Sequence, residues 1–243
     1  MSPFLITVAA HKGGVGKTTL AYELAAALGA VLVDLDWDAG GATRMWGIDP
    51  TATRRAPLLD ALERGPGTTP RPRRRAGQPP LVPSHPDLSA SHIEQDLVAD
   101  CLAAWRTSLG APVVVDTHPG ANPLTDGAVE AADLVVVPTP LGVRELAALE
   151  QGLAELGGHR VLVVPTMVPA QPPRRLVDAL AALTHGRCRV APPVSEHRWL
   201  RRRLRRSAVV LQSNPGSRVR AAADEFRAVA RTIEEALSDR AAA

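Results

Sequence analysis

Residues 11–19 read HKGGVGKTT, and this stretch decides the fold. Before it, Phe4 to Ala10 is an apolar run that favours a β-strand, and after it, Leu20 to Leu28 is rich in Ala and Leu and favours a helix. A strand, a glycine-rich loop and a helix in this order are typical of a phosphate-binding loop. Glycines let backbone N–H groups converge on an anion, and the start of the helix adds its positive dipole end.

Two side chains of this loop have the chemistry that a nucleoside triphosphate requires. We expect Lys17 to reach the β- and γ-phosphates and the Thr18 hydroxyl to ligate Mg²⁺. The common pattern GxxxxGK(S/T) is broken at its first position, where His11 replaces glycine. The residues expected to contact the nucleotide here are Lys12, Gly13, Gly14, Val15, Gly16, Lys17, Thr18 and Thr19.

Both lysines of the chain lie in this loop. Of the 28 basic residues, only Lys12 and Lys17 are lysine, so every other basic side chain is an arginine. The segment KGGVGKTT resembles the deviant Walker A loop of the ParA/MinD superfamily. In that superfamily the earlier lysine reaches across a nucleotide-sandwich dimer to the phosphates bound by the partner subunit. The resemblance implies that Lys12 and Lys17 are both catalytic, with Lys12 coupling catalysis to dimer formation.

Two apolar runs, residues 31–36 and 112–116, contain or end in carboxylates and read as buried parallel strands. Ligands of such sheets bind at the carboxyl ends of the strands. By the same resemblance, Asp36 is the catalytic carboxylate that positions the attacking water, although Trp37-Asp38 follows it where the family usually has Pro-Gln. Asp116 is the Walker B residue that holds Mg²⁺ through a water, so the expected metal site is Thr18, Asp36 and Asp116.

Several other polar or reactive side chains are expected to be structural. Asp34 belongs to the strand rather than to the reaction, and His118 is interpreted as a turn residue because no second histidine lies at ligand spacing. Cys101 and Cys188 form no CxxC motif, which favours buried free thiols over a disulfide or a zinc site.

Strand and helix patterns alternate along the rest of the chain. Residues 134–138 and 160–165 read as buried strands, and 143–156 and 176–183 as helices, which together predict an α/β fold with a doubly wound, mostly parallel sheet flanked by helices. The resemblance covers about residues 4–237 and implies that Thr166 lies in the adenine pocket.

Residues 63–90 interrupt this alternation with seven prolines and the arginines Arg71, Arg73, Arg74 and Arg75. The composition indicates a flexible basic insertion. Leu81 to Ser84 resembles a short family strand, so we expect residues 1–243 to form a single ATPase domain that contains this insertion. The arginine run is either a solvated loop or an accessory phosphate-binding patch.

The C-terminal region, about residues 196–237, is predicted to be helical and basic. On a helix, Leu200 and Leu204 face one side while a stripe of arginines faces the other, formed by Arg198, Arg201, Arg202 and Arg205. Like charges at this spacing destabilise a helix unless an anion faces them, which favours sequence-independent contact with DNA phosphates over a merely solvated face. The final helix, 221–237, is expected to pack on the sheet, because its tail is neither apolar nor basic enough to bind a membrane.

Composition narrows the class of protein. With 45% hydrophobic and 22% charged residues and a net charge of +3, the chain of 243 residues has a globular balance, which excludes disorder throughout. No run approaches the ~18 apolar residues of a membrane span, and no basic segment precedes the first apolar run. We therefore expect a cytoplasmic protein.

The resemblance implies a ParA-type partition ATPase of the short kind, because a first strand at Phe4 leaves no room for an N-terminal DNA-reading domain. Such an enzyme takes ATP and Mg²⁺, closes as an ATP-sandwich homodimer and, when ATP-bound, associates with the nucleoid through nonspecific double-stranded DNA. A ParB-like centromere-binding partner stimulates its hydrolysis.

Three alternatives share the loop. The first is a positioning ATPase of the MinD or flagellar-number type, acting at a membrane or a protein assembly. The second is an iron–sulfur enzyme like the nitrogenase iron protein, although Cys101 and Cys188 do not lie in the matching segments. The third is a nucleotide switch that does not hydrolyse ATP.

Overall fold

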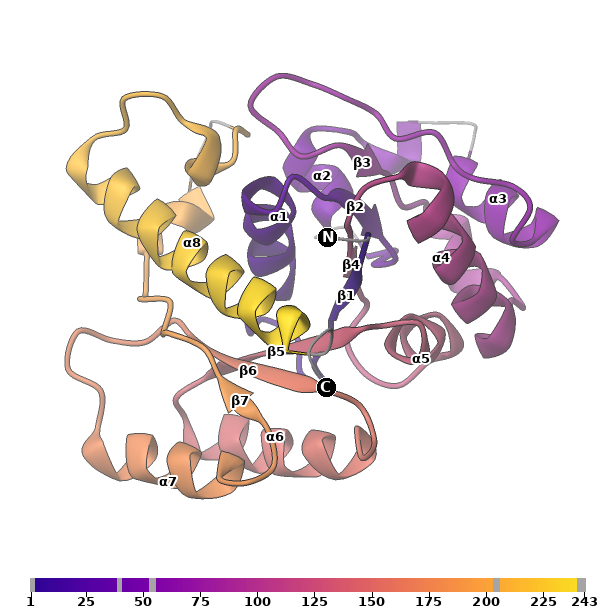
Figure 1. Ribbon diagram of the computed structural model, residues 1–243. Helices are drawn as coiled ribbons and strands as arrows, with labels where there is room; N and C mark the ends of the chain where they lie inside the picture. The colour runs from indigo at the N-terminus through magenta and orange to yellow at the C-terminus, as the bar shows by residue number, and fades with distance from the viewer. Residues whose placement is uncertain (1–2, 39–40, 53–55, 203–205, 240–243) are drawn as a thin grey trace.

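The computed structural model describes residues 3–38, 41–52, 56–202 and 206–239. Within them, seven strands form one sheet in the order β3-β2-β4-β1-β5-β6-β7, with every neighbouring pair parallel (Figure 1). The strands are β1 (Leu5–Val8), β2 (Val31–Asp34), β3 (Leu81–Val82), β4 (Val113–Asp116), β5 (Leu134–Pro140), β6 (Val161–Thr166) and β7 (Arg189–Val190). This confirms the predicted doubly wound parallel sheet.

Helices cover both faces of the sheet, which is why its central strands are apolar on both sides. One face packs against α1 (Lys17–Ala27), α2 (Ala42–Trp46) and α8 (Ser217–Ser238). The other packs against α3 (Pro57–Arg64), α4 (Gln95–Leu109), α5 (Pro123–Glu130), α6 (Val143–Glu155) and α7 (Arg174–Thr184). Four short 3₁₀ segments also occur in the described chain: η1 (Pro50–Ala52), η2 (Pro86–Ala90), η3 (Arg198–Arg202) and η4 (Val209–Leu211).

Helix α8 lies beside α1, as Figure 1 shows, and buries the apolar side that the sequence predicts. Phe226, Val229 and Ile233 are buried in the same core cluster as Ile6 of β1, which confirms that the helix packs on the sheet. None of the helices formed by the described residues could span a lipid bilayer.

The proline- and arginine-rich insertion differs from the expected flexible segment. Residues 65–80 form neither helix nor strand, but they are fastened to the body of the protein. The indole N–H of Trp105 donates to the Thr68 carbonyl at 2.8 Å, and that of Trp46 donates to the Pro79 carbonyl at 2.9 Å. A β-bridge also pairs Arg73 with Leu81. Long-range indole hydrogen bonds, which composition does not encode, fix the path of this loop.

The α-helix predicted to carry the arginine stripe is wrong at its start. Arg198–Arg202 is a 3₁₀ segment rather than the start of an α-helix. The side chains of Arg201 and Arg202, and the whole of Arg205, lie outside the described residues. Tertiary contacts determine the path of this segment, because His197 pairs with Glu225 of α8 at 2.8 Å and Tyr22 of α1 donates to the Arg206 carbonyl at 2.7 Å.

Candidate functional site

The glycine-rich loop joins β1 to α1 and leaves the helix N-terminus open. Gly16 is the N-cap of α1, and no side chain caps the helix, so its first N–H groups have no intrahelical acceptor. Gly14 and Gly16 adopt φ of 76° and 96°, a region that side-chain-bearing residues avoid. Nothing lies within 4 Å of the position that a Gly14 Cβ would take. An open ring of backbone donors at a helix start fits a phosphate group.

Lys17 is buried at the first position of α1, with 5% of its surface exposed. Its ammonium donates to the Lys12 carbonyl at 3.4 Å, so it folds back along the loop as a phosphate-binding lysine would. Burial lowers the pKa of Lys17, while Asp116 and Asp36 raise it. The two carboxylates thus oppose the effect of burial, which favours the neutral amine.

Asp116 ends β4, next to β1 and β2, and pairs in register with Val8 and Asp34. Its side chain is fully buried, and among the described residues neither carboxylate oxygen has a hydrogen-bond partner. Burial raises its pKa well above the usual range, and Asp34 and Asp36 raise it further. The Thr18 hydroxyl, which lies near the carboxylate but outside regular hydrogen-bond geometry, and Lys17 lower it. An unpartnered buried carboxylate facing Thr18 and Lys17 fits a hydrated Mg²⁺, whose waters would supply the missing donors.

Asp34 is structural, as the sequence predicts. Its carboxylate accepts from the Thr43 N–H and hydroxyl, both at 2.6 Å, and from the Asp36 N–H at 3.1 Å. The Thr43 hydroxyl oxygen also accepts from the Ser84 N–H at 2.7 Å. A Cβ at Gly41 would lie 3.0 Å from the Asp34 carboxylate, so the start of α2 approaches this close only through glycine. This network, which sequence reasoning missed, holds the segment after β2 against β3.

Asp36 lies just beyond β2 with 9% of its surface exposed, close enough to Lys17 for their charges to interact. Burial raises the pKa of Asp36, and the Asp38 N–H that donates to it at 3.1 Å lowers that pKa. Asp36 and Asp116 therefore come together at the carboxyl edge of the sheet, beside the start of α1, as predicted.

His118 joins the segment after β2 to the segment after β4. Its ring stacks on Trp37 with centroids 4.0 Å apart, and its Nε2 lies 3.1 Å from a carboxylate oxygen of Asp38. Its Nδ1 lies 2.8 Å from the Pro119 carbonyl oxygen. Ligand atoms of Asp36, Asp38 and His118 lie within 4.8 Å of one another, so they could share a cation. Trp37-Asp38, which departs from the family pattern, is thus the pair that contacts His118.

Thr166 ends β6 and is buried, and its hydroxyl donates to the Val15 carbonyl at 2.8 Å. The contact braces the glycine-rich loop from the side of β6. Met167 follows with φ of 52°, and its methyl group lies 3.4 Å from where a Gly16 Cβ would be. The structure therefore brings Thr166 to the phosphate loop itself, and the adenine contact expected from the resemblance stays a prediction.

Helix α6 holds the first two residues of the loop. The Lys12 ammonium pairs with Glu145, and His11 Nε2 lies 3.0 Å from Glu155. Both pairs lie beside a cavity of about 270 Å³ between α5 and α6. The lining of that cavity includes Lys12 and Val15 of the phosphate loop but neither Lys17 nor Asp36, so the cavity borders the predicted nucleotide site on the side of Lys12. Sequence reasoning did not anticipate these partners, because they lie more than 100 residues from the loop.

Comparisons with known proteins agree with this geometry. Residues 4–159 match the AAA_31 family, described as an AAA domain. The chain is 33% identical to the chromosome-partitioning ATPase Soj of Thermus thermophilus over 203 residues, which cover 78% of this chain and 73% of Soj. It is 35% identical to the chromosome partitioning protein ParA of Caulobacter vibrioides over 178 residues, which cover 63% of this chain and 60% of ParA. The chain thus spans less than two thirds of that relative.

Among solved structures, the ATP complex of a McdA variant from Cyanothece has a TM-score of 0.74 to this chain at 19% identity. The match covers 98% of this chain and 97% of McdA. At this identity the likeness shows a shared fold.

Proposed function

The chain belongs to the ParA/MinD family of P-loop ATPases, and on that premise we propose that it is a DNA-partition ATPase driven by ATP and Mg²⁺. Two relatives named for chromosome partitioning support this choice within the family. The observation that carries the nucleotide part is the buried, unpartnered Asp116 carboxylate beside Lys17 and Thr18, at an uncapped helix start.

In the proposed reaction, the residues of the loop position and neutralise the triphosphate. The N–H groups at the start of α1 and the Lys17 ammonium hold the phosphates, while Thr18 and Asp116 hold the cation, directly and through water. When bound, Mg²⁺ supplies charge neutralisation at the phosphate oxygens. Asp36 orients the attacking water, and its raised pKa suits a group that accepts a hydrogen bond from that water. The products are ADP and phosphate.

The dimer is proposed to be part of the same site. Lys12 leaves Glu145 and reaches the phosphates of the partner subunit, which makes a complete site depend on two copies of the chain. The ATP-bound homodimer then binds nonspecific DNA through the arginines near Arg198, which is exposed and pairs with Glu196 at 3.3 Å. A ParB-like partner stimulates hydrolysis and release, so the protein alternates between the nucleoid and the cytoplasm.

Phosphate release measured with the wild type and with Lys17→Ala tests the enzymatic part of this proposal. We expect Mg²⁺-dependent turnover by the wild type, abolished by chelation and by Lys17→Ala. Sedimentation velocity with ATP tests the dimer, which Lys12→Ala should prevent while ATP binding is retained. Turnover unaffected by Lys17→Ala, or dimerisation that needs no nucleotide, would contradict the proposal.

A further inference from the structure

Two basic segments that are far apart in the sequence lie against each other. The Ala208 N–H donates to the Gly77 carbonyl at 2.8 Å, and the Gln78 amide donates to the Arg206 carbonyl at 3.2 Å. Figure 1 shows the loop before β3 and the segment before α8 together at the top of the molecule. The arginines of the two segments therefore belong to one surface.

We call this surface the arginine face and define it by Arg71, Arg73, Arg74, Arg75 and Arg206, all of which are exposed. Neither residues 65–80 nor residues 206–216 contain Asp or Glu. In the part of the chain that the structure describes, none of the five guanidinium groups forms an ion pair. The face thus carries positive charge that the described chain leaves unneutralised.

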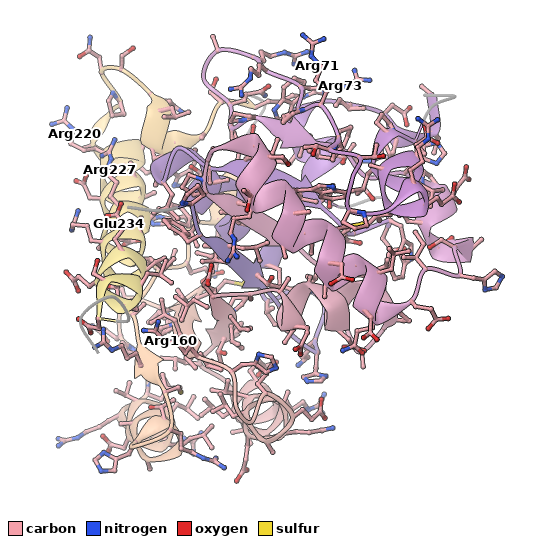
Figure 2. The ribbon with its side chains drawn as sticks, turned by 45° about the vertical axis from the view of Figure 1, so that its right-hand side comes forward. Arg71, Arg73, Arg160, Arg220, Arg227 and Glu234 are labelled. Atoms are coloured by element: carbon pink, nitrogen blue, oxygen red, sulfur yellow. The ribbon has the colours of Figure 1, made fainter. Side chains whose placement is uncertain are left out.

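Packing contacts hold the arginine face in a defined position. Arg75 stacks over the Trp46 ring with its guanidinium carbon 4.5 Å from the ring centroid, and Trp46 itself anchors the loop through Pro79. Arg206 lies against Gly47, where a Cβ would clash with its guanidinium. Figure 2 shows Arg71 and Arg73 pointing outward at the top of the molecule. A fastened loop that presents outward-pointing arginines loses little conformational entropy when it binds an anionic surface.

This face is distinct from the predicted nucleotide site. Residues 71–75 lead into the amino end of β3, whereas the phosphate loop leaves the carboxyl end of the parallel strand β1. Helix α1 nevertheless contacts both the nucleotide site and the arginine face. It starts at Lys17, and its Glu23 carboxylate accepts from the N–H of Val209, in the segment that carries Arg206, at 2.8 Å. Substitutions on the outer loop can therefore be made without touching the groups proposed for hydrolysis.

We propose that the arginine face binds the phosphate backbone of duplex DNA and extends the DNA contact beyond the region of Arg198. This inference rests on the proposed DNA-partition function. Arginine donates to phosphate in a planar fork, and an irregular loop without a base-reading helix gives contacts that position DNA without reading its sequence. A lipid surface suits the face less well, because among the described residues of the two segments Leu211 is the one large hydrophobic side chain that is exposed.

The test is the salt dependence of duplex binding by the full chain with ATP and Mg²⁺, followed by the anisotropy of a labelled random-sequence duplex. The variant Arg71→Gln/Arg73→Gln/Arg74→Gln removes three charges from the loop and leaves Arg75 on Trp46. The matched control is Arg174→Gln/Arg175→Gln/Arg187→Gln, which removes three exposed charges in and just after α7. Helix α7 lies at the bottom of Figure 1, whereas the loop before β3 lies at the top.

We expect the log–log salt slope of the loop variant to be shallower than that of the wild type by up to about 2.7, at about 0.9 for each phosphate that the variant no longer neutralises. The control should keep the wild-type slope, and all three proteins should hydrolyse ATP at the same basal rate. Equal slopes for the loop variant and the wild type would overturn this inference and leave the proposed function standing.

Two further outcomes separate this inference from the function on which it rests. If the wild type binds no duplex in any nucleotide state, the DNA part of the proposed function fails together with the arginine face. If the wild type sediments with vesicles of anionic phospholipid and the loop variant does not, while duplex binding is absent, the partner is a membrane and the inference is wrong.

Discussion

Lys12, in the phosphate loop, pairs with Glu145, in the first turn of α6 and 133 residues away. The pair lies at the surface, and Lys12 lowers the pKa of Glu145. The lysine proposed to act across a dimer therefore contacts a carboxylate of its own subunit. Formation of the proposed dimer must break this pair. Glu145 therefore competes with the phosphates held by the partner subunit for the Lys12 ammonium.

Replacing Glu145 by Gln should free Lys12 and favour the ATP-dependent dimer. A surface ion pair is worth about 0.2–1 kcal/mol and the homodimer breaks two of them, one in each subunit, so the dimer dissociation constant should fall by about twofold to thirtyfold. Sedimentation velocity over a range of protein concentrations measures this shift. Glu150→Gln, which removes an exposed carboxylate from the same helix, should leave the constant unchanged. A weaker dimer in Glu145→Gln would mean that Glu145 stabilises the closed state instead.

Asp36→Ala should bind ATP and form the dimer but hydrolyse ATP at least about 100-fold more slowly, because the group that orients water is removed. Single-turnover hydrolysis and nucleotide binding, measured on the same sample, separate the two steps. The variant should accumulate as an ATP-bound dimer. Hydrolysis at the parent rate would remove Asp36 from its proposed role.

Asp116→Asn should stabilise the nucleotide-free protein while abolishing Mg²⁺-dependent turnover. The substitution removes a carboxyl group whose charged form is disfavoured by burial, and we expect the free energy of unfolding at pH 8 to rise by about 1–3 kcal/mol. Urea denaturation without nucleotide measures the gain. A destabilised variant would indicate that other groups in the nucleotide-free protein already offset the cost of burying the Asp116 carboxylate.

The same carboxylates predict how stability depends on pH. Burial raises the pKa of Asp34 from 3.8 to about 7, and that of Asp116 well above its usual range. A carboxyl group whose pKa is higher in the folded state binds more protons there, so its contribution to stability is fully present below its ordinary pKa and is lost as the pH rises toward its folded-state pKa, which is about 7 for Asp34. The advantage of Asp116→Asn over the wild type should therefore be larger at pH 8 than at pH 5. An equal gain in stability at pH 5 and pH 8 would show that the buried charge of Asp116 is not the cause of the gain.

Thr166→Val tests whether Thr166 braces the loop or reads the base. Removal of its hydrogen bond to the Val15 carbonyl should cost about 0.5–1.5 kcal/mol of binding free energy. The binding of ATP and of GTP should weaken by the same factor, because the bond braces the loop that holds the phosphates. Isothermal titration with both nucleotides measures this factor. A weakening confined to ATP would instead support the adenine contact implied by the family resemblance.

The sequence was sufficient to predict the strands, the loop and the helix around the phosphate site, which depend on neighbouring residues. The apolar runs before Lys17 and Asp116 form β1 and β4, and the glycines between β1 and α1 form the loop. Parallel pairing then brings the ends of these strands together, which is why Asp36 and Asp116 lie near Lys17 as predicted.

What the sequence could not provide is the choice of partners across the chain. The contacts of Lys12 with Glu145 and of Trp37 with His118 join segments 80 or more residues apart. The hydrophobic pattern along the sequence does not indicate which distant side chains meet. The α-helix predicted at Arg198–Arg202 was wrong for the same reason. Local spacing favoured an α-helix there, whereas His197 and Tyr22 fix the ends of the segment through tertiary contacts.

Nucleotide-dependent DNA binding by the wild type is the most direct test of the proposed partition function. Anisotropy of a random-sequence duplex should rise with ATP and Mg²⁺, stay low with ADP or without nucleotide, and fall steeply as salt is added. Binding that is equal in all three nucleotide states, or absent from all of them, would contradict a DNA-partition ATPase and leave the ATPase fold in need of another partner.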